Sequence, residues 1–135
     1  MSIDLASVAL GDVVATAEGP PFDAQALARY AQASGDLNPL HTDRAFAAKA
    51  GFPDLVVHGM LNMARLGRLV TAHFPAQQIL SFSVRFEGVL LAGQATTMAM
   101  TLSARSEGGA EFELQMRTSG DQRIASGVVK VSTFL

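Results

Sequence analysis

The residues best suited to chemistry lie close together in one short segment. Asp36 and His41 stand five positions apart, with Asn38 and Pro39 between them. A carboxylate and an imidazole can together hold a water molecule and move protons near neutral pH. Asn38 adds a donor and an acceptor that could orient the pair, and Pro39 stiffens the segment. This spacing favours an acid–base site, although each residue taken alone is also ordinary turn chemistry.

The tripeptide Ser-Gly-Asp carries little weight by itself, because the chain uses it twice. It opens the candidate segment at residues 34–36 and occurs again at 119–121, where a hairpin turn explains it completely. The complete string from Ser34 to His41 is much harder to explain as turn chemistry alone. We therefore expect the reactive chemistry of the chain in this segment.

A second candidate begins at His58-Gly59, where a long apolar segment starts. The first backbone amides of a helix lack partners within the helix and carry the positive end of its dipole. Gly59 lets another group approach that backbone closely. A helix start that faces the Asp36–His41 segment could therefore stabilise an oxyanion. The alternative is an ordinary helix start with His58 as a hydrogen-bonded core histidine.

Metal ligation is less well supported than acid–base chemistry. Asp36 and Asn38 imitate the start of a calcium loop, but Leu40 stands where the next oxygen ligand belongs. His41 and His58 could bind zinc, yet no third ligand stands at a recognisable spacing. The chain has no cysteine, which excludes thiolate ligands, thiol catalysis and disulfides. We expect no metal here.

Helices are expected around these residues. Asp23 is a suitable N-cap for a first helix, and Gly35 closes it. A short helix capped at residues 42–43 should end at Gly51. The segment from about residue 59 to 73 is apolar on nearly all sides, which predicts a buried helix.

After Pro75 the hydrophobic period changes to two, which predicts strands with one buried face. Gly108-Gly109 and residues 119–122 supply hairpin turns, and a last strand should run from Ile124 to Phe134. We expect an α+β fold, in which one long helix covers an antiparallel meander in a single domain over residues 1–135. The side chains expected to face the core are Leu80, Phe82, Val84, Phe86, Met98, Met100, Leu102, Phe112, Leu114 and Met116.

The amino-acid composition limits which kinds of partner can be expected for the chain. A hydrophobic share of 49% with only 16% charged residues suggests an apolar surface that is covered in an oligomer. The net charge of −2 gives no reason to expect nucleic acid. No apolar run approaches the roughly 20 residues of a membrane span. The N-terminal residues do not read as a signal peptide, so the cytoplasm is the expected location.

The string from Tyr30 to Asp43, together with His58-Gly59-Met60-Leu61, resembles the hydratase-2 motif of a known family. This is the family of MaoC-like (R)-specific enoyl-CoA hydratases and 3-hydroxyacyl-thioester dehydratases. The resemblance implies a hot-dog fold, in which an antiparallel sheet wraps around a long central helix. It also implies a dimer, either a homodimer or a heterodimer with a related hot-dog subunit.

The resemblance further implies roles for individual residues. Asp36 and His41 would be the catalytic pair, which adds water to C3 of a trans-2-enoyl thioester and delivers a proton at C2. Asn38 would orient the loop, and the Gly59 amide would stabilise the enolate-like thioester oxygen. No cofactor would be needed, because the substrate is an acyl thioester of CoA or of acyl-carrier protein. The candidates for the substrate pocket are His58, Met60 and Asn62.

One departure and two alternatives remain. Several family members carry a serine where this chain has Ala64, so that a hydroxyl contact is missing or Asn62 replaces it. An acyl-thioester hydrolase on the same fold is one alternative activity. The other is a heterodimeric dehydratase, in which this chain would be the catalytic subunit because it keeps Asp36 and His41.

Overall fold

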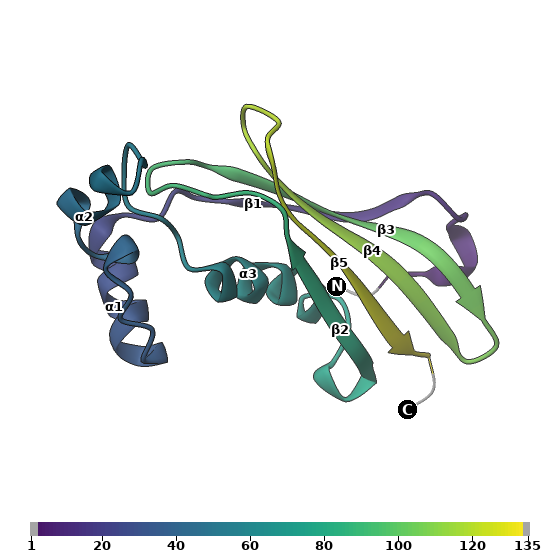
Figure 1. Ribbon diagram of the computed structural model, residues 1–135. Helices are drawn as coiled ribbons and strands as arrows, with labels where there is room; N and C mark the ends of the chain where they lie inside the picture. The colour runs from purple at the N-terminus through teal and green to yellow at the C-terminus, as the bar shows by residue number, and fades with distance from the viewer. Residues whose placement is uncertain (1–2, 134–135) are drawn as a thin grey trace.

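The computed structural model describes residues 3–133, and a five-stranded antiparallel sheet forms most of it (Figure 1). The order across the sheet is β1-β3-β4-β5-β2. The long helix α3 (Gly59–Thr71) lies against one face, while α1 (Ala24–Ser34) and α2 (Arg44–Lys49) lie together at one end. The strands are β1 (Val13–Gly19), β2 (Ile79–Phe86), β3 (Thr96–Ser106), β4 (Gly109–Thr118) and β5 (Arg123–Ser132). Three 3-10 turns complete the described elements: Leu5–Ser7, Pro39–His41 and Ala76–Gln78.

The centre of the sheet confirms the predicted alternation in β3 and β4. The register pairs Met98 with Met116 and Met100 with Leu114, and all four side chains are at most 5% exposed. Burial of each such side chain stabilises the fold by about 1.5–3 kcal/mol. The hairpin that joins the two strands turns where Gly108-Gly109 was expected. The last strand ends at Ser132, and the predicted terminus Phe134 lies outside the described residues.

The predicted meander is wrong for β2. This strand does not pair with β3, which follows it in the chain, but lies at the sheet edge beside β5. Its predicted buried face is also incomplete, since Leu80 is 68% and Phe86 is 49% exposed. The register shifts between Ile79 and Ser81, so Leu80 falls out of the alternation. An edge strand also lacks a neighbour on its far side, which leaves its ends open to solvent.

The prediction of a helix buried on all sides is wrong for α3 in this chain. Its buried residues are Asn62, Leu66, Leu69 and Val70, whereas Met60 is 57% exposed. The reason is that a single sheet covers only one side of the helix. Among the described residues, no helix is long and apolar enough to cross a membrane.

Two glycines bring α3 close to the edge strand. A Cβ added at Gly59 would lie 3.3 Å from ring atoms of Phe86, and one added at Gly67 would lie 3.4 Å from the Phe82 ring. A methyl group would be in ordinary contact at Gly67 and slightly tight at Gly59, so only side chains larger than that of alanine would push helix and strand apart. The aromatic rings of β2 therefore occupy space that the glycines leave free.

The capping predictions are confirmed for α1. The Asp23 carboxylate accepts a hydrogen bond from Ala26 N at 2.8 Å, and Gly35 ends the helix in the left-handed region at φ 78°. Asp43 likewise caps α2 through Phe46 N at 3.1 Å, although that helix ends at Lys49. These caps fix where the Asp36–His41 segment leaves one helix and enters the next.

Candidate active site

The loop that follows α1 is organised by its own polar side chains. The backbone N–H of Asp36 donates to Ser34 Oγ at 3.2 Å, and that of Asn38 donates to Asp36 Oδ1 at 3.3 Å. Asn38 then caps the Pro39–His41 turn, since its Oδ1 accepts from Leu40 N at 3.0 Å. These short-range bonds determine the direction in which the loop presents its two ionisable groups.

His41 is held by a bond from outside the loop. Its ring nitrogen Nδ1 lies 2.7 Å from the carbonyl oxygen of Val56, so this nitrogen carries the proton and donates it. In the neutral ring Nε2 is then a proton acceptor, and it lies 3.6 Å from Asp36 Oδ2. The His41 side chain is 11% exposed and the Asp36 side chain 52%. The structure thus brings Asp36 and His41 together, with the imidazole enclosed and the carboxylate open to solvent.

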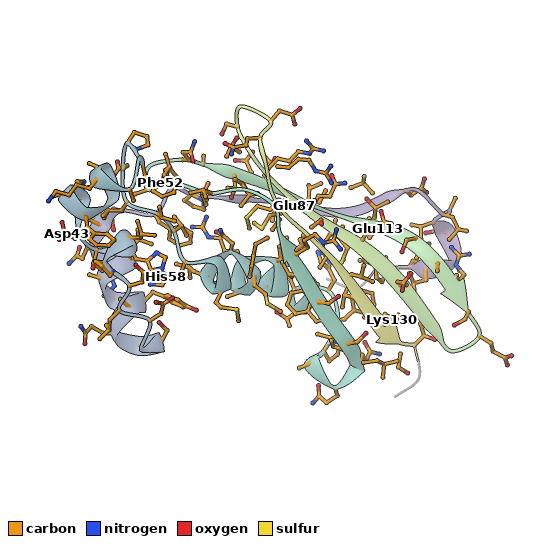
Figure 2. All side chains as sticks on the ribbon, in the orientation of Figure 1. Asp43, Phe52, His58, Glu87, Glu113 and Lys130 are labelled. Carbon is orange, nitrogen blue, oxygen red and sulfur yellow. The ribbon has the colours of Figure 1, made fainter. Side chains whose placement is uncertain are left out.

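His58 lies next to the Asp36–His41 pair. Figure 2 shows its ring between α1 and the first turn of α3, and it is 1% exposed. It stacks on His41 with ring centroids 3.7 Å apart and planes inclined by 19°. Tyr30 meets it edge-on at 4.7 Å. Nε2 of His58 lies 3.3 Å from the backbone carbonyl oxygen of Asp36, so this ring links α3 to the loop.

Burial determines the charge of His58. Its pKa lies below the ordinary value of 6.5, first because burial penalises the charged ring and second because a charge on His41 would repel it. The hydrogen bond to the Asp36 carbonyl and the Asp36 carboxylate act in the opposite direction but are weaker. His58 is therefore neutral near neutral pH.

The remaining predicted site residues lie at the start of α3, and they differ in how deeply they are buried. Gly59 is the first helical residue, so its N–H has no acceptor within the helix. Met60 beside it is 57% exposed, whereas Asn62 is 3% exposed. Ala64 is exposed, so it lies on another side of the helix from Asn62. Within residues 3–133, His58 Nδ1, Asn62 Oδ1 and Arg65 Nη1 are buried without a hydrogen-bond partner.

The fold supplies a third potential metal ligand that the spacing did not reveal. Ligand atoms of Asp36, His41 and His58 all lie within 4.8 Å of one another. However, the lone pair of an imidazole nitrogen lies in the ring plane, and the two rings are stacked nearly parallel. Their lone pairs cannot converge on one ion without a change of ring orientation. This geometry suits proton transfer better than ligation.

Two contributions to the site were not found from the sequence. The Val56 carbonyl orients His41, and a backbone group of this kind leaves no signal in residue type. The edge-on contact of Tyr30 with His58 joins two residues that were noted only as parts of separate motifs. Nearby on α3, Arg65 packs its guanidinium over the Phe22 ring at 3.6 Å, and burial lowers its pKa.

Comparison with known proteins shows which family this chain is similar to. The model of the MaoC-like domain family matches residues 6–129. The mitochondrial 3-hydroxyacyl-[acyl-carrier-protein] dehydratase of Arabidopsis thaliana is 39% identical over 84 residues, which is 62% of this chain and 49% of that protein. The (R)-specific enoyl-CoA hydratase of Aeromonas caviae is 34% identical over 88 residues, which is 64% of this chain and 66% of that protein.

The solved structure of the A. caviae (R)-hydratase involved in PHA biosynthesis superposes with a TM-score of 0.82 at 29% identity. The superposition covers 93% of this chain and 97% of that one. The chain therefore belongs to the MaoC-like domain family and has a hot-dog fold. It spans about half the length, or less, of the first curated relatives it matches, which are larger proteins.

Proposed function

We propose that this chain is a hydro-lyase that reversibly hydrates trans-2-enoyl thioesters to (R)-3-hydroxyacyl thioesters. The observation that carries this proposal is the pair formed by Asp36 Oδ2 and His41 Nε2 at 3.6 Å, next to the start of α3. Membership of the MaoC-like family supports it, as do the names of the Arabidopsis and Aeromonas relatives.

In the proposed reaction, Asp36 and His41 hold one water molecule between them. The water oxygen bonds to C3, its proton passes to the pair, and a proton is delivered at C2. With its proton on Nδ1, the His41 ring suits this role because its Nε2 can accept a proton and faces the carboxylate. Dehydration follows the same path in reverse. Asn38 orients the pair through its cap of the Pro39–His41 turn.

The Gly59 amide is the proposed donor to the thioester oxygen, which gains negative charge as water adds to C3. Its N–H is free of the helix and lies at the positive end of the dipole. Met60 is proposed to contact the acyl group, because it is exposed beside this amide. Activated water, an acid and a polarised carbonyl suffice for the reaction, so we propose that it needs neither cofactor nor metal.

The direct test is the loss of enoyl absorbance on crotonyl-CoA and on longer enoyl-CoA substrates. We expect hydration by the wild type and a loss of about 10²- to 10⁴-fold in both Asp36→Ala and His41→Ala. The same chain-length series on acyl-carrier protein identifies the carrier. Release of free thiol from saturated acyl-CoA, without any hydration, would instead establish the alternative thioesterase activity.

The oxyanion role of Gly59 can be tested by removing its N–H. Proline is well tolerated at the first position of a helix, and His58 already has the extended backbone that a following proline requires, at φ −57° and ψ 132°. Gly59→Pro should therefore lower kcat by about 10²- to 10³-fold while α3 persists. Gly59→Ala is the matched control, since it adds a Cβ beside Phe86 but keeps the N–H.

We also propose that the chain works as a homodimer or as a heterodimer with a related hot-dog subunit. Strand β2 is a sheet edge, and exposed apolar residues lie on it and on α3: Leu80, Phe86 and Met60. An open apolar edge of this kind favours pairing with another strand. Light scattering should give a dimer mass, and Leu80→Asp should reduce it. Leu10, which is 62% exposed, provides the control substitution Leu10→Asp.

Finally, we propose that residues 1–135 form a single domain. The family match spans residues 6–129. One hydrophobic cluster joins α1, α3 and the sheet within the described chain. Unfolding in urea should accordingly occur in a single transition, seen alike by circular dichroism and by Tyr30 fluorescence.

A further inference from the structure

His58 is a buried ionisable side chain for which the proposed chemistry has no step. It is 1% exposed, so it offers no surface to a substrate. It nevertheless contacts both members of the catalytic pair: the His41 ring at 3.7 Å between centroids, and the Asp36 carbonyl oxygen at 3.3 Å from Nε2. A residue placed in this way can influence the reaction only through its neighbours.

Hydrogen-bond partners assign different tautomers to the two stacked rings. A carbonyl oxygen can only accept a hydrogen bond, so the ring nitrogen that faces it must carry the proton: Nδ1 of His41, towards Val56, and Nε2 of His58, towards Asp36. His41 therefore presents an accepting nitrogen to the Asp36 carboxylate. His58 instead presents a donor to the backbone of the same aspartate. The two histidines thus have separate tasks.

The ionisable groups packed around His58 are Tyr30, His41 and Asp36. Burial and the neighbouring His41 lower its pKa, so the ring stays neutral where the enzyme would work. A neutral ring that keeps its proton on a structural hydrogen bond is a poor proton carrier. It is well suited to hold other groups in place.

We propose that His58 is a positioning residue for the Asp36–His41 pair. Its Nε2–H holds the Asp36 carbonyl, and its ring supports one face of the His41 ring. The Asp36 side chain is half exposed on a loop, so the direction of its carboxylate depends on how firmly the backbone is held. The inference rests on the proposed hydration activity, because it concerns the geometry of that reaction.

Two substitutions separate the hydrogen bond from the ring. His58→Phe keeps a ring to stack on His41 but has no donor, whereas His58→Gln keeps an N–H donor without the ring. We expect kcat to fall up to about a hundredfold in His58→Phe, with KM nearly unchanged, because a displaced catalytic group slows the chemical step. His58→Gln should retain about tenfold more activity than His58→Phe. The pH profile of kcat/KM should keep both limbs in each variant.

Two outcomes of the kinetics would overturn the inference. If both variants lose as much activity as His41→Ala and one limb of the pH profile disappears, His58 is itself an acid–base group. If both variants only lower the unfolding midpoint, with kcat per folded molecule unchanged, His58 is a packing residue and nothing more.

A measurement that needs no turnover distinguishes failure of this inference from failure of the proposed function. The chain has three histidines, so long-range proton–nitrogen NMR spectra can be assigned ring by ring. At pH 7 we expect the Nε2–H tautomer for His58 and the Nδ1–H tautomer for His41, with the His41 tautomer becoming mixed in His58→Phe. A charged or Nδ1–H His58, or a His41 signal indifferent to His58→Phe, would contradict the positioning role even in an inactive protein.

Discussion

The tripeptide Ser-Gly-Asp occurs at residues 34–36 and at 119–121, in two different structural surroundings. At the first, Gly35 takes the left-handed backbone at φ 78° and ends a helix. At the second, Asp121 takes it at φ 68° in the hairpin between β4 and β5. Asp36 faces a buried imidazole at 3.6 Å, whereas Asp121 is 84% exposed and approaches Arg117 at 3.5 Å. The neighbours, and not the tripeptide, decide whether the aspartate can do chemistry.

The largest expected difference between the two regions is in activity. Asp36→Asn preserves the shape of the side chain but removes its charge, so kcat/KM for enoyl-CoA hydration should fall by about 10²- to 10⁴-fold. Asp121→Asn should stay within about twofold of the wild type, because that carboxylate is 84% exposed and solvent screens its ion pair with Arg117. Equal losses in the two variants would show that the first aspartate has no special role.

A smaller difference is expected in stability when each glycine is replaced. Gly35→Ala forces a side chain into the left-handed region and should lower the free energy of unfolding by about 1 kcal/mol. Gly120 does not have a positive φ, and a Cβ there would lie 3.8 Å from Thr118 Oγ1, so Gly120→Ala should change stability by less than about 0.5 kcal/mol. Urea unfolding curves measure both values. A larger cost at Gly120 would contradict this assignment.

The smallest expected effect is on the pH dependence of stability. The pKa of His58 is lower in the folded chain than the ordinary 6.5, so just below that pH the unfolded chain binds more protons. The free energy of unfolding should therefore decrease as the pH falls from 7 to 5. This decrease should be shallower in His58→Phe and unaltered in Asp121→Asn. A His58→Phe variant with the wild-type slope would mean that His58 titrates normally.

Local signals predicted the helices and central strands near the site well. Asp23 and Gly35 bound α1 as expected, because capping depends on bonds within a few residues. The alternation in β3 and β4 likewise identified the buried face, since both strands have neighbours on each side. The proximity of Asp36 and His41 also followed from their short loop.

Long-range pairing could not be read from the same patterns. Nothing in β2 indicates that it pairs with β5 instead of β3, because both have a compatible apolar face. The apolar composition of α3 could not tell which side the sheet covers. The stack of His58 on His41 depends on how far α3 lies from the loop, which only the assembled fold determines.

The two glycine–phenylalanine contacts between α3 and β2 require the intervening lengths of helix and strand to match. Gly59 meets Phe86 and Gly67 meets Phe82, so the two elements run in opposite directions. Eight residues of helix rise about 12 Å, and four residues of strand about 13 Å, so the two intervals nearly match. An insertion or deletion of one residue between Gly59 and Gly67, or between Phe82 and Phe86, would move the rings away from the glycines. Variation in length should therefore be tolerated in the connection between α3 and β2 and excluded from the two elements themselves.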